Sequence, residues 1–176
     1  MIDLIGTLEG EEWLYYGFSF LIVIILAFTF HEFAHAFVAY KQGDLTPKAQ
    51  GRVSLNPLKH IDPVGFALCF LFGIGWAKPV QINPLKFKSY RKGMIKVSIA
   101  GVIANLIMAF IGCGCATAMG MFSGFANKFV FFLFVLFTTM FNVNIALFVF
   151  NLLPVPPLDG FNIVLALSKT ENKYIK

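Results

Sequence analysis

Long apolar runs separated by short polar stretches dominate the pattern of this chain. Three of them are long enough to cross a bilayer as helices, since about 20 apolar residues span its hydrocarbon core. They cover Trp13–Tyr40, Val97–Phe122 and Phe129–Leu153. The pattern therefore predicts an all-α polytopic membrane protein with three long transmembrane helices.

The region between the first two runs has a different character. It is polar and rich in Pro and Gly, and then carries a shorter apolar piece, Val64–Trp76, interrupted by glycines. That piece is about 12 residues long, or roughly 18 Å as a helix, against a hydrocarbon core of about 30 Å. Gln50–Leu55 and Lys78–Asn83 alternate weakly between polar and apolar positions, as short strands do. We therefore expect a short re-entrant or β-hairpin segment around residues 50–83, shielded from lipid by protein.

Composition supports membrane insertion and excludes other classes of protein. Of the 176 residues, 58% are hydrophobic and 13% are charged, whereas soluble domains have about 45–50% and about 25%. So apolar a chain is not disordered, and its three cysteines provide no disulfide framework. The length fits one domain, so we expect residues 1–176 to form a single membrane-embedded core domain.

The net charge of +5 is unevenly distributed. Ten of the fourteen Lys and Arg residues lie between Lys41 and Lys96, whereas residues 1–12 contain acidic residues and no basic one. Because cytoplasmic loops are enriched in Lys and Arg, we expect a multi-pass protein of the cell membrane with its N-terminus outside and the basic 77–96 loop in the cytoplasm. No nucleic-acid motif accompanies these charges, so the expected partner is the lipid bilayer and not nucleic acid.

The first apolar run contains the sequence His31-Glu32-Phe33-Ala34-His35. On a helix, residues four apart project from one face, so the two histidines can bind one zinc ion while Glu32 acts on a water as general base. The alternative is a chance pattern whose histidines form hydrogen bonds within a helix bundle. A charged residue in hydrocarbon costs about 2.5–3.5 kcal/mol, which favours a functional cluster over chance.

A catalytic zinc site needs a third protein ligand and an open position for water. Asp159 follows the third apolar run and a Pro-rich stretch, and Gly160 comes directly after it. Asp159 could cap a helix that begins near Gly160. If residues 65–76 do not cross the membrane, however, the third run returns to the side of the two histidines. We therefore expect one Zn²⁺ per chain, with His31, His35 and Asp159 as ligands.

At these two motifs the sequence resembles the site-2 protease family of intramembrane zinc metalloproteases, in its compact bacterial branch. The match consists of His-Glu-x-x-His at residues 31–35 and Asn-x-x-Pro-x-x-x-Leu-Asp-Gly at residues 151–160. The resemblance implies hydrolysis of peptide bonds in transmembrane protein substrates that another protease usually cuts first. Water must reach the site, so we expect its opening to face the cytoplasm.

The resemblance also implies roles for individual residues. It makes His31, His35 and Asp159 the zinc ligands and Glu32 the general base. A membrane metal-binding or transport protein could use the same His and Asp cluster as an ion site, but it would not need Glu32.

A further motif of the family, Gly-Pro-x-x-Asn, falls at residues 101–105, where Val102 stands in place of Pro. The resemblance implies that Asn105 helps to hold the substrate or the transition state. The other interpretation of Asn105 is a hydrogen bond between helices, which polar residues in membranes commonly make.

Overall fold

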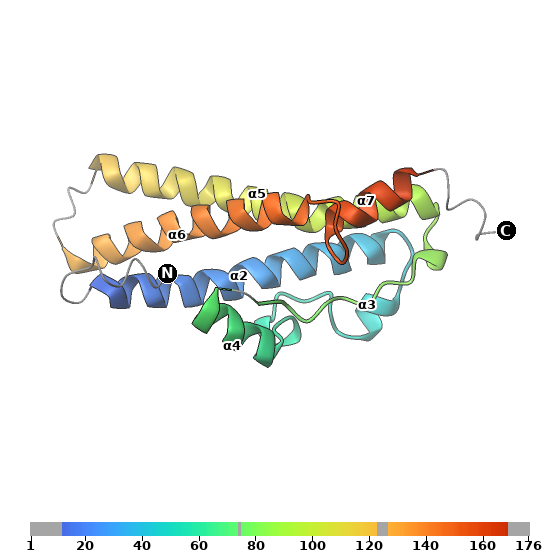
Figure 1. The fold of residues 1–176 in the computed structure, drawn as a ribbon, viewed down its shortest axis with the longest axis horizontal. Coiled ribbons are helices and arrows are strands. Elements are labelled where there is room, and N and C mark those ends of the chain that lie inside the picture. The colour runs from blue at the N-terminus through green and yellow to red at the C-terminus, as the bar shows by residue number, and fades with distance from the viewer. Residues whose placement is uncertain (1–11, 74, 123–126, 169–176) are drawn as a thin grey trace.

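Three long helices lie side by side and form the body of the molecule (Figure 1). The structure, a computed structural model, describes residues 12–73, 75–122 and 127–168. The long helices are α2 (Glu12–Lys41), α5 (Tyr90–Phe122) and α6 (Lys128–Asn151). Each is long and apolar enough to cross a membrane, so the described residues contain the three long apolar helices that the sequence predicts.

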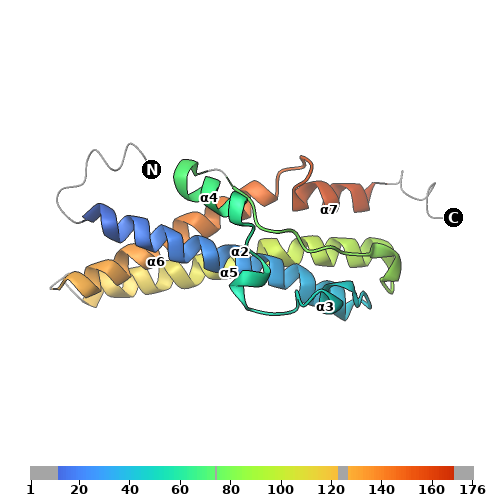
Figure 2. The ribbon, with the colours of Figure 1, turned by 90° about the horizontal axis from the view of Figure 1, so that it is seen from below.

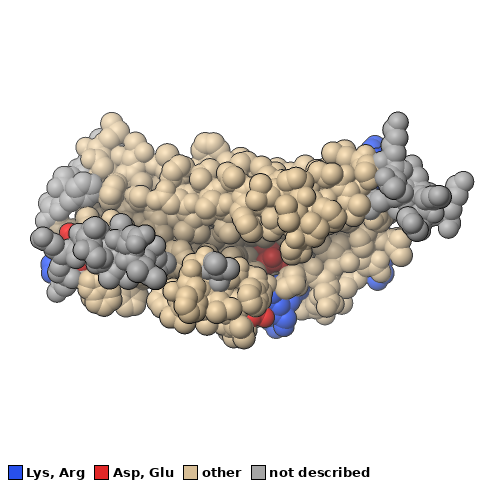
Figure 3. Space-filling view, viewed as in Figure 1, with Lys and Arg blue, Asp and Glu red and all other residues tan. Residues whose placement is uncertain are grey.

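The outer faces of these helices are apolar. Figure 3 shows few charged side chains on the visible face between the two ends of the molecule. Such a surface would aggregate in water, whereas acyl chains solvate it in a bilayer. The chain is therefore a multi-pass membrane protein. The exposed apolar side chains include Phe18, Ile103, Ile107, Phe110, Phe129 and Val149.

Helix α5 begins at Tyr90, earlier than the apolar run that starts at Val97. Its first two turns are basic, so hydropathy alone does not detect them although the backbone is already helical. Val23 of α2, Met108 of α5 and Met140 of α6 form a buried apolar cluster that joins the three helices. Packing of this kind is what holds helices together in lipid, where no hydrophobic effect drives them together.

The region between α2 and α5 contains two short helices, α3 (Thr46–Ala49) and α4 (Pro63–Phe72), and two 3₁₀ turns, Pro57–Lys59 and Pro84–Lys86. Helix α4 corresponds to the short apolar piece of the sequence. At ten residues, or about 15 Å, it is too short to cross a bilayer. It packs against the middle of α2 through the buried Cys69, and Figure 2 shows the two helices together.

The expected strands at residues 50–55 and 78–83 are not formed. The described residues contain no strand, and a single antiparallel bridge between Ile61 and Ala77 joins the two sides. Gly51 has φ +67°, a left-handed turn conformation that ends any extended run, and Pro79 has no N–H to donate to a ladder. Residues 78–83, the extended segment, therefore form no strand, and only their first residue, Lys78, makes a backbone hydrogen bond to the other side, to the carbonyl of His60.

Two buried side chains hold this extended segment in place. The Arg52 guanidinium donates to the carbonyls of Lys59 and Lys78. At the other end, Asp44, which is 0% exposed, accepts hydrogen bonds from the backbone N–H groups of Asn83 at 2.6 Å and Thr46 at 3.0 Å. Burial opposes ionisation of the Asp44 carboxyl, but these hydrogen bonds outweigh it and hold its pKa below the usual value.

We predict that Asp44→Asn lowers the free energy of unfolding by about 1–3 kcal/mol, because the amide leaves one buried N–H donor unpaired. The pKa of Asp44 is lower in the folded protein than the ordinary value of about 4. Its stabilisation is therefore complete above that value and is lost as the pH falls through the folded pKa. Thermal unfolding in detergent, followed by circular dichroism between pH 7 and pH 3, measures both effects.

Asp62→Asn provides the matched control. The Asp62 side chain also accepts two backbone hydrogen bonds, from Val64 and Gly65, but it is partly exposed. Its substitution should cost less stability than Asp44→Asn. Equal losses in the two variants would contradict the role given to Asp44.

Candidate metal centre

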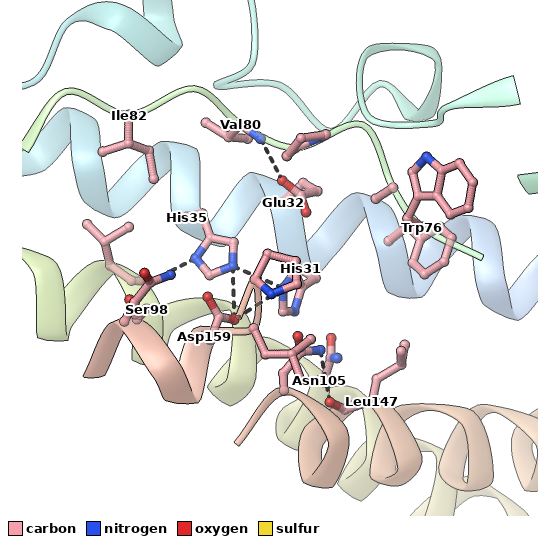
Figure 4. A pocket seen from close by; sticks show the side chains of 18 of the residues that line it. His31, Glu32, His35, Trp76, Val80, Ile82, Ser98, Asn105, Leu147 and Asp159 are labelled. Carbon is pink, nitrogen blue, oxygen red and sulfur yellow. Dashed lines mark hydrogen bonds and ion pairs between the residues drawn. The ribbon is translucent and has the colours of Figure 1, made fainter. Parts of the chain in front are cut away.

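Two histidines and a glutamate project from the C-terminal half of α2 (Figure 4). His31 and His35 lie one helical turn apart, with their Nε2 atoms separated by 3.0 Å and their ring centroids by 4.5 Å. The rings are nearly perpendicular, with an angle of 86° between their planes. Glu32 is 9% exposed and lies beside them.

Asp159 comes to the same point from the other end of the chain. It is the first residue of α7 (Asp159–Leu167), and its Oδ2 lies 3.4 Å from Nε2 of His31 and 3.2 Å from Nε2 of His35. The N-cap of α7 is Leu158, and no side-chain hydrogen bond caps this helix. Asp159 therefore points at the histidines and is not the cap that its sequence context also allowed. These three residues form a group that could hold a metal ion.

Backbone groups orient the side chains of the centre. Nδ1 of His35 lies 2.8 Å from the carbonyl oxygen of Val97 in α5. A carbonyl only accepts, so Nδ1 carries the proton and Nε2 presents its lone pair to the centre. The N–H of Val80, in the extended segment, donates to Oε2 of Glu32 at 2.9 Å.

A cavity of about 470 Å³ lies over this group, and it is lined by residues of α2, α5, α7, the end of α6 and the extended segment. Asn105 of α5 lines the cavity and lies near His31 in Figure 4. Its amide is 1% exposed, and neither its nitrogen nor its oxygen has a hydrogen-bond partner in the described part of the chain. The Asn105 side chain interacts with the His31 ring of α2, across the two helices.

The pair His60 and Asp62 is not part of this centre. Nε2 of His60 bonds to the carbonyl of Ser54 at 2.7 Å, and burial lowers the pKa of the ring. Asp62 caps α4. Both side chains therefore stabilise the turns between α3 and α4.

Sequence reasoning did not identify the contacts of Val80 and Val97, because both act through the backbone and their side chains give no signal. It also gave no role to Gly101, which α5 brings against the imidazoles. A Cβ at this position would lie 2.7 Å from Cε1 of His31 and closer still to the ring of His35. A glycine in the interior of an apolar helix, four residues before Asn105, was the available signal.

Comparisons with known proteins agree with this geometry. The family model Peptidase family M50 matches residues 116–176. The "Putative zinc metalloprotease YwhC" of Bacillus subtilis is 45% identical over 163 residues, which cover 88% of this chain and 73% of that protein. The "Putative zinc metalloprotease Rip2" of Mycolicibacterium smegmatis is 31% identical, over 84% of this chain and 57% of its own length.

The protein of the same name from Mycobacterium tuberculosis is 30% identical, over 89% of this chain and 62% of its own length. This chain thus spans about three fifths of the mycobacterial relatives. No solved structure matches at a significant level. The extent of the similarity to the Bacillus protein, together with the family match, shows that this chain belongs to peptidase family M50, the site-2 protease family of zinc metalloproteases.

Proposed function

We propose that this chain hydrolyses peptide bonds of transmembrane proteins within the membrane, with His31, His35 and Asp159 as ligands of one Zn²⁺ and Glu32 as general base. One observation carries the proposal. Two imidazole nitrogens and a carboxylate oxygen, from helices at opposite ends of the chain, meet beside a buried glutamate in a cavity between apolar spans.

The residues present fit a zinc ion. Two nitrogens and one carboxylate oxygen are a donor set of catalytic zinc, which uses three protein ligands and keeps one position open. Oδ2 of Asp159 is buried and has no hydrogen-bond donor in the described part of the chain. A buried carboxylate is costly without a cation, and a metal would supply one. Gly101 leaves room for both rings at this point.

In the proposed reaction, a zinc ion held by His31, His35 and Asp159 would supply Lewis acidity to a water molecule and to the scissile carbonyl. Glu32 takes a proton from the attacking water and returns it to the nitrogen of the leaving amine. Its Oε2 is held by the N–H of Val80, which leaves Oε1 to receive the proton. The Nδ1–H of His35, bound to Val97, keeps the ring turned toward the reacting groups.

We assign to Asn105 the role of binding the substrate carbonyl or stabilising the transition state. Its amide is buried on the wall of the cavity and makes no hydrogen bond of normal geometry within the described part of the chain, so it can donate to an oxygen that becomes negative during attack. The substrate must be unwound at the cleavage site, because a helix hides its carbonyls in internal hydrogen bonds. A transmembrane segment already cut by another protease is the substrate that we propose.

We also propose that residues 1–176 act as one membrane-embedded domain, with the N-terminus outside and the basic 77–96 loop and the opening of the site toward the cytoplasm. The distribution of Lys and Arg supports this orientation. An odd number of spans is consistent with it, because α6 then returns Asp159 to the side that holds the histidines. Helix α4 is too short to add a fourth crossing.

We predict that Glu32→Gln retains zinc and loses cleavage by at least about 100-fold, because the amide cannot accept the proton. The measurements are zinc content and cleavage of a model transmembrane substrate by the purified full chain in proteoliposomes. Chelation of zinc should also abolish cleavage, and added Zn²⁺ should restore it. A metal-transport protein would keep its ion flux in Glu32→Gln. The protease function would be contradicted if both the wild type and Glu32→Gln bound zinc and neither of them cleaved the substrate.

Asn105→Ala should lower kcat by about 100-fold while zinc content stays unchanged, as for loss of one donor to a developing oxyanion. Asn144→Ala is the matched control, since Asn144 is equally buried but donates to Met140 of its own helix. Steady-state kinetics on the same substrate distinguish the two. Similar losses of kcat in both variants would mean that the loss of a buried amide affects only the fold, and would refute the role given to Asn105.

Gly101→Ala should displace the imidazoles, because its methyl group would occupy the space of the two rings. We expect weaker zinc binding, by roughly 10-fold or more, and a corresponding loss of cleavage. Gly114→Ala, in the same helix, is the control, since a Cβ at that position meets nothing within 4 Å. Zinc titration of both variants checks this, and unchanged affinity in Gly101→Ala would show that the rings do not depend on this close approach.

A further inference from the structure

Arg91, near the start of α5, binds the end of α7. Its Nε donates to the carbonyl of Ala166 at 2.7 Å, and its Nη2 donates to the carbonyls of Leu167 at 2.6 Å and Ser168 at 3.1 Å. The last carbonyls of a helix have no partner within the helix, and the negative end of the helix dipole attracts a cation. Arg91 therefore supplies a C-terminal cap to α7 from another helix.

Helix α7 depends on such outside contacts for its position. It is nine residues long, its N-terminus has no side-chain cap, and α5 is the helix against which it packs (Figures 1 and 2). At its first turn, Gly160 lies against the backbone of Leu152 and Leu153, where a Cβ would collide with both carbonyl oxygens. The start of α7 is thus fitted against the end of α6, and Arg91 holds its other end.

The two ends of α7 lie beside two positions of α5, Gly101 and Arg91. Arg91 precedes Gly101 by ten residues, or about 15 Å along α5, and Asp159 precedes Ala166 by seven residues, or about 10 Å along α7. The carboxylate of Asp159 meets the imidazoles against which Gly101 packs, and Ala166 meets Arg91. The two helices therefore run antiparallel, and a shift or rotation of α7 along α5 would move Asp159 relative to the histidines.

We propose that Arg91 is a positioning residue of the metal centre, which places Asp159 by holding the C-terminal carbonyls of α7. This inference rests on the proposed role of Asp159 as a zinc ligand. A guanidinium suits the task because its planar fork donates in fixed directions to several oxygens, whereas a lysine ammonium has no such preset geometry. Retention of the charge alone is therefore not sufficient.

The test measures the zinc dissociation constant of the purified full chain in detergent, by competition with a chelator of known affinity. Arg91→Ala should weaken zinc binding by roughly 10- to 100-fold, the range for loss of a group that orients a ligand. It should also change the visible absorption of the Co²⁺-substituted protein. Arg91→Lys should fall between Arg91→Ala and the wild type. Lys92→Ala, which removes the neighbouring exposed charge, should behave as the wild type.

A double-mutant cycle separates positioning from general stability. In an Asp159→Ala background, Arg91→Ala should cause no further loss of zinc affinity, because the group that it positions is absent. Wild-type affinity and an unchanged Co²⁺ spectrum in Arg91→Ala would overturn the inference, and so would a further loss in the Asp159→Ala background. If Arg91→Ala does not yield folded protein, Arg91→Lys takes its place in the cycle, with the same outcomes deciding.

The single variant Asp159→Ala distinguishes failure of this inference from failure of the proposed function. Unchanged zinc affinity in Asp159→Ala would refute the ligand set itself, and the role of Arg91 with it. Weakened affinity in Asp159→Ala together with wild-type affinity in Arg91→Ala would leave the ligand set intact and refute only the positioning role.

Discussion

The candidate site depends on the close approach of the α5 backbone to the two imidazoles of α2. The carbonyl of Val97 binds Nδ1 of His35, and Gly101 lets both rings fill the space that a side chain would take. A histidine in an apolar helix could adopt several rotamers and either tautomer. The α5 contacts favour one arrangement, in which the two Nε2 atoms lie close to each other and to the carboxylate at the first turn of α7.

Helix α5 also carries two further residues of the proposed site. Asn105 follows Gly101 by one turn and lines the cavity, and Arg91 at the start of the helix holds α7. Val102 occupies a position where the related motif has Pro, and α5 continues through it without interruption. A valine keeps its N–H, so the helix needs no break to bring Gly101 against the histidines. One continuous helix therefore relates α2 to α7, although the two are more than a hundred residues apart in sequence.

Features that depend on local sequence could be predicted, whereas contacts between distant backbone segments could not. The geometry of His31 and His35 follows from helical periodicity, and Asp159 could be placed beside them because the number of crossings decides on which side it lies. The weak alternation of residues 78–83 predicted a strand, which Pro79 and the turn at Gly51 prevent. Contacts of the Val80 and Val97 backbones leave no trace in side-chain identity, so no pattern could reveal them.

One of the proposed ligands, Asp159, lies on a short helix, α7. Helices in lipid associate through packing and hydrogen bonds without a hydrophobic driving force between them, and α7 is short and packs mainly on α5. In the proposed ligand set, an ion bound by α2 and α7 would join the two directly, and its binding energy would add to the stability of the assembled site. Glu32 is held separately, by the extended segment through Val80. Glu32 thus shares α2 with the two histidines but has its own backbone partner in the extended segment, whereas Asp159 is placed by the contacts of α7.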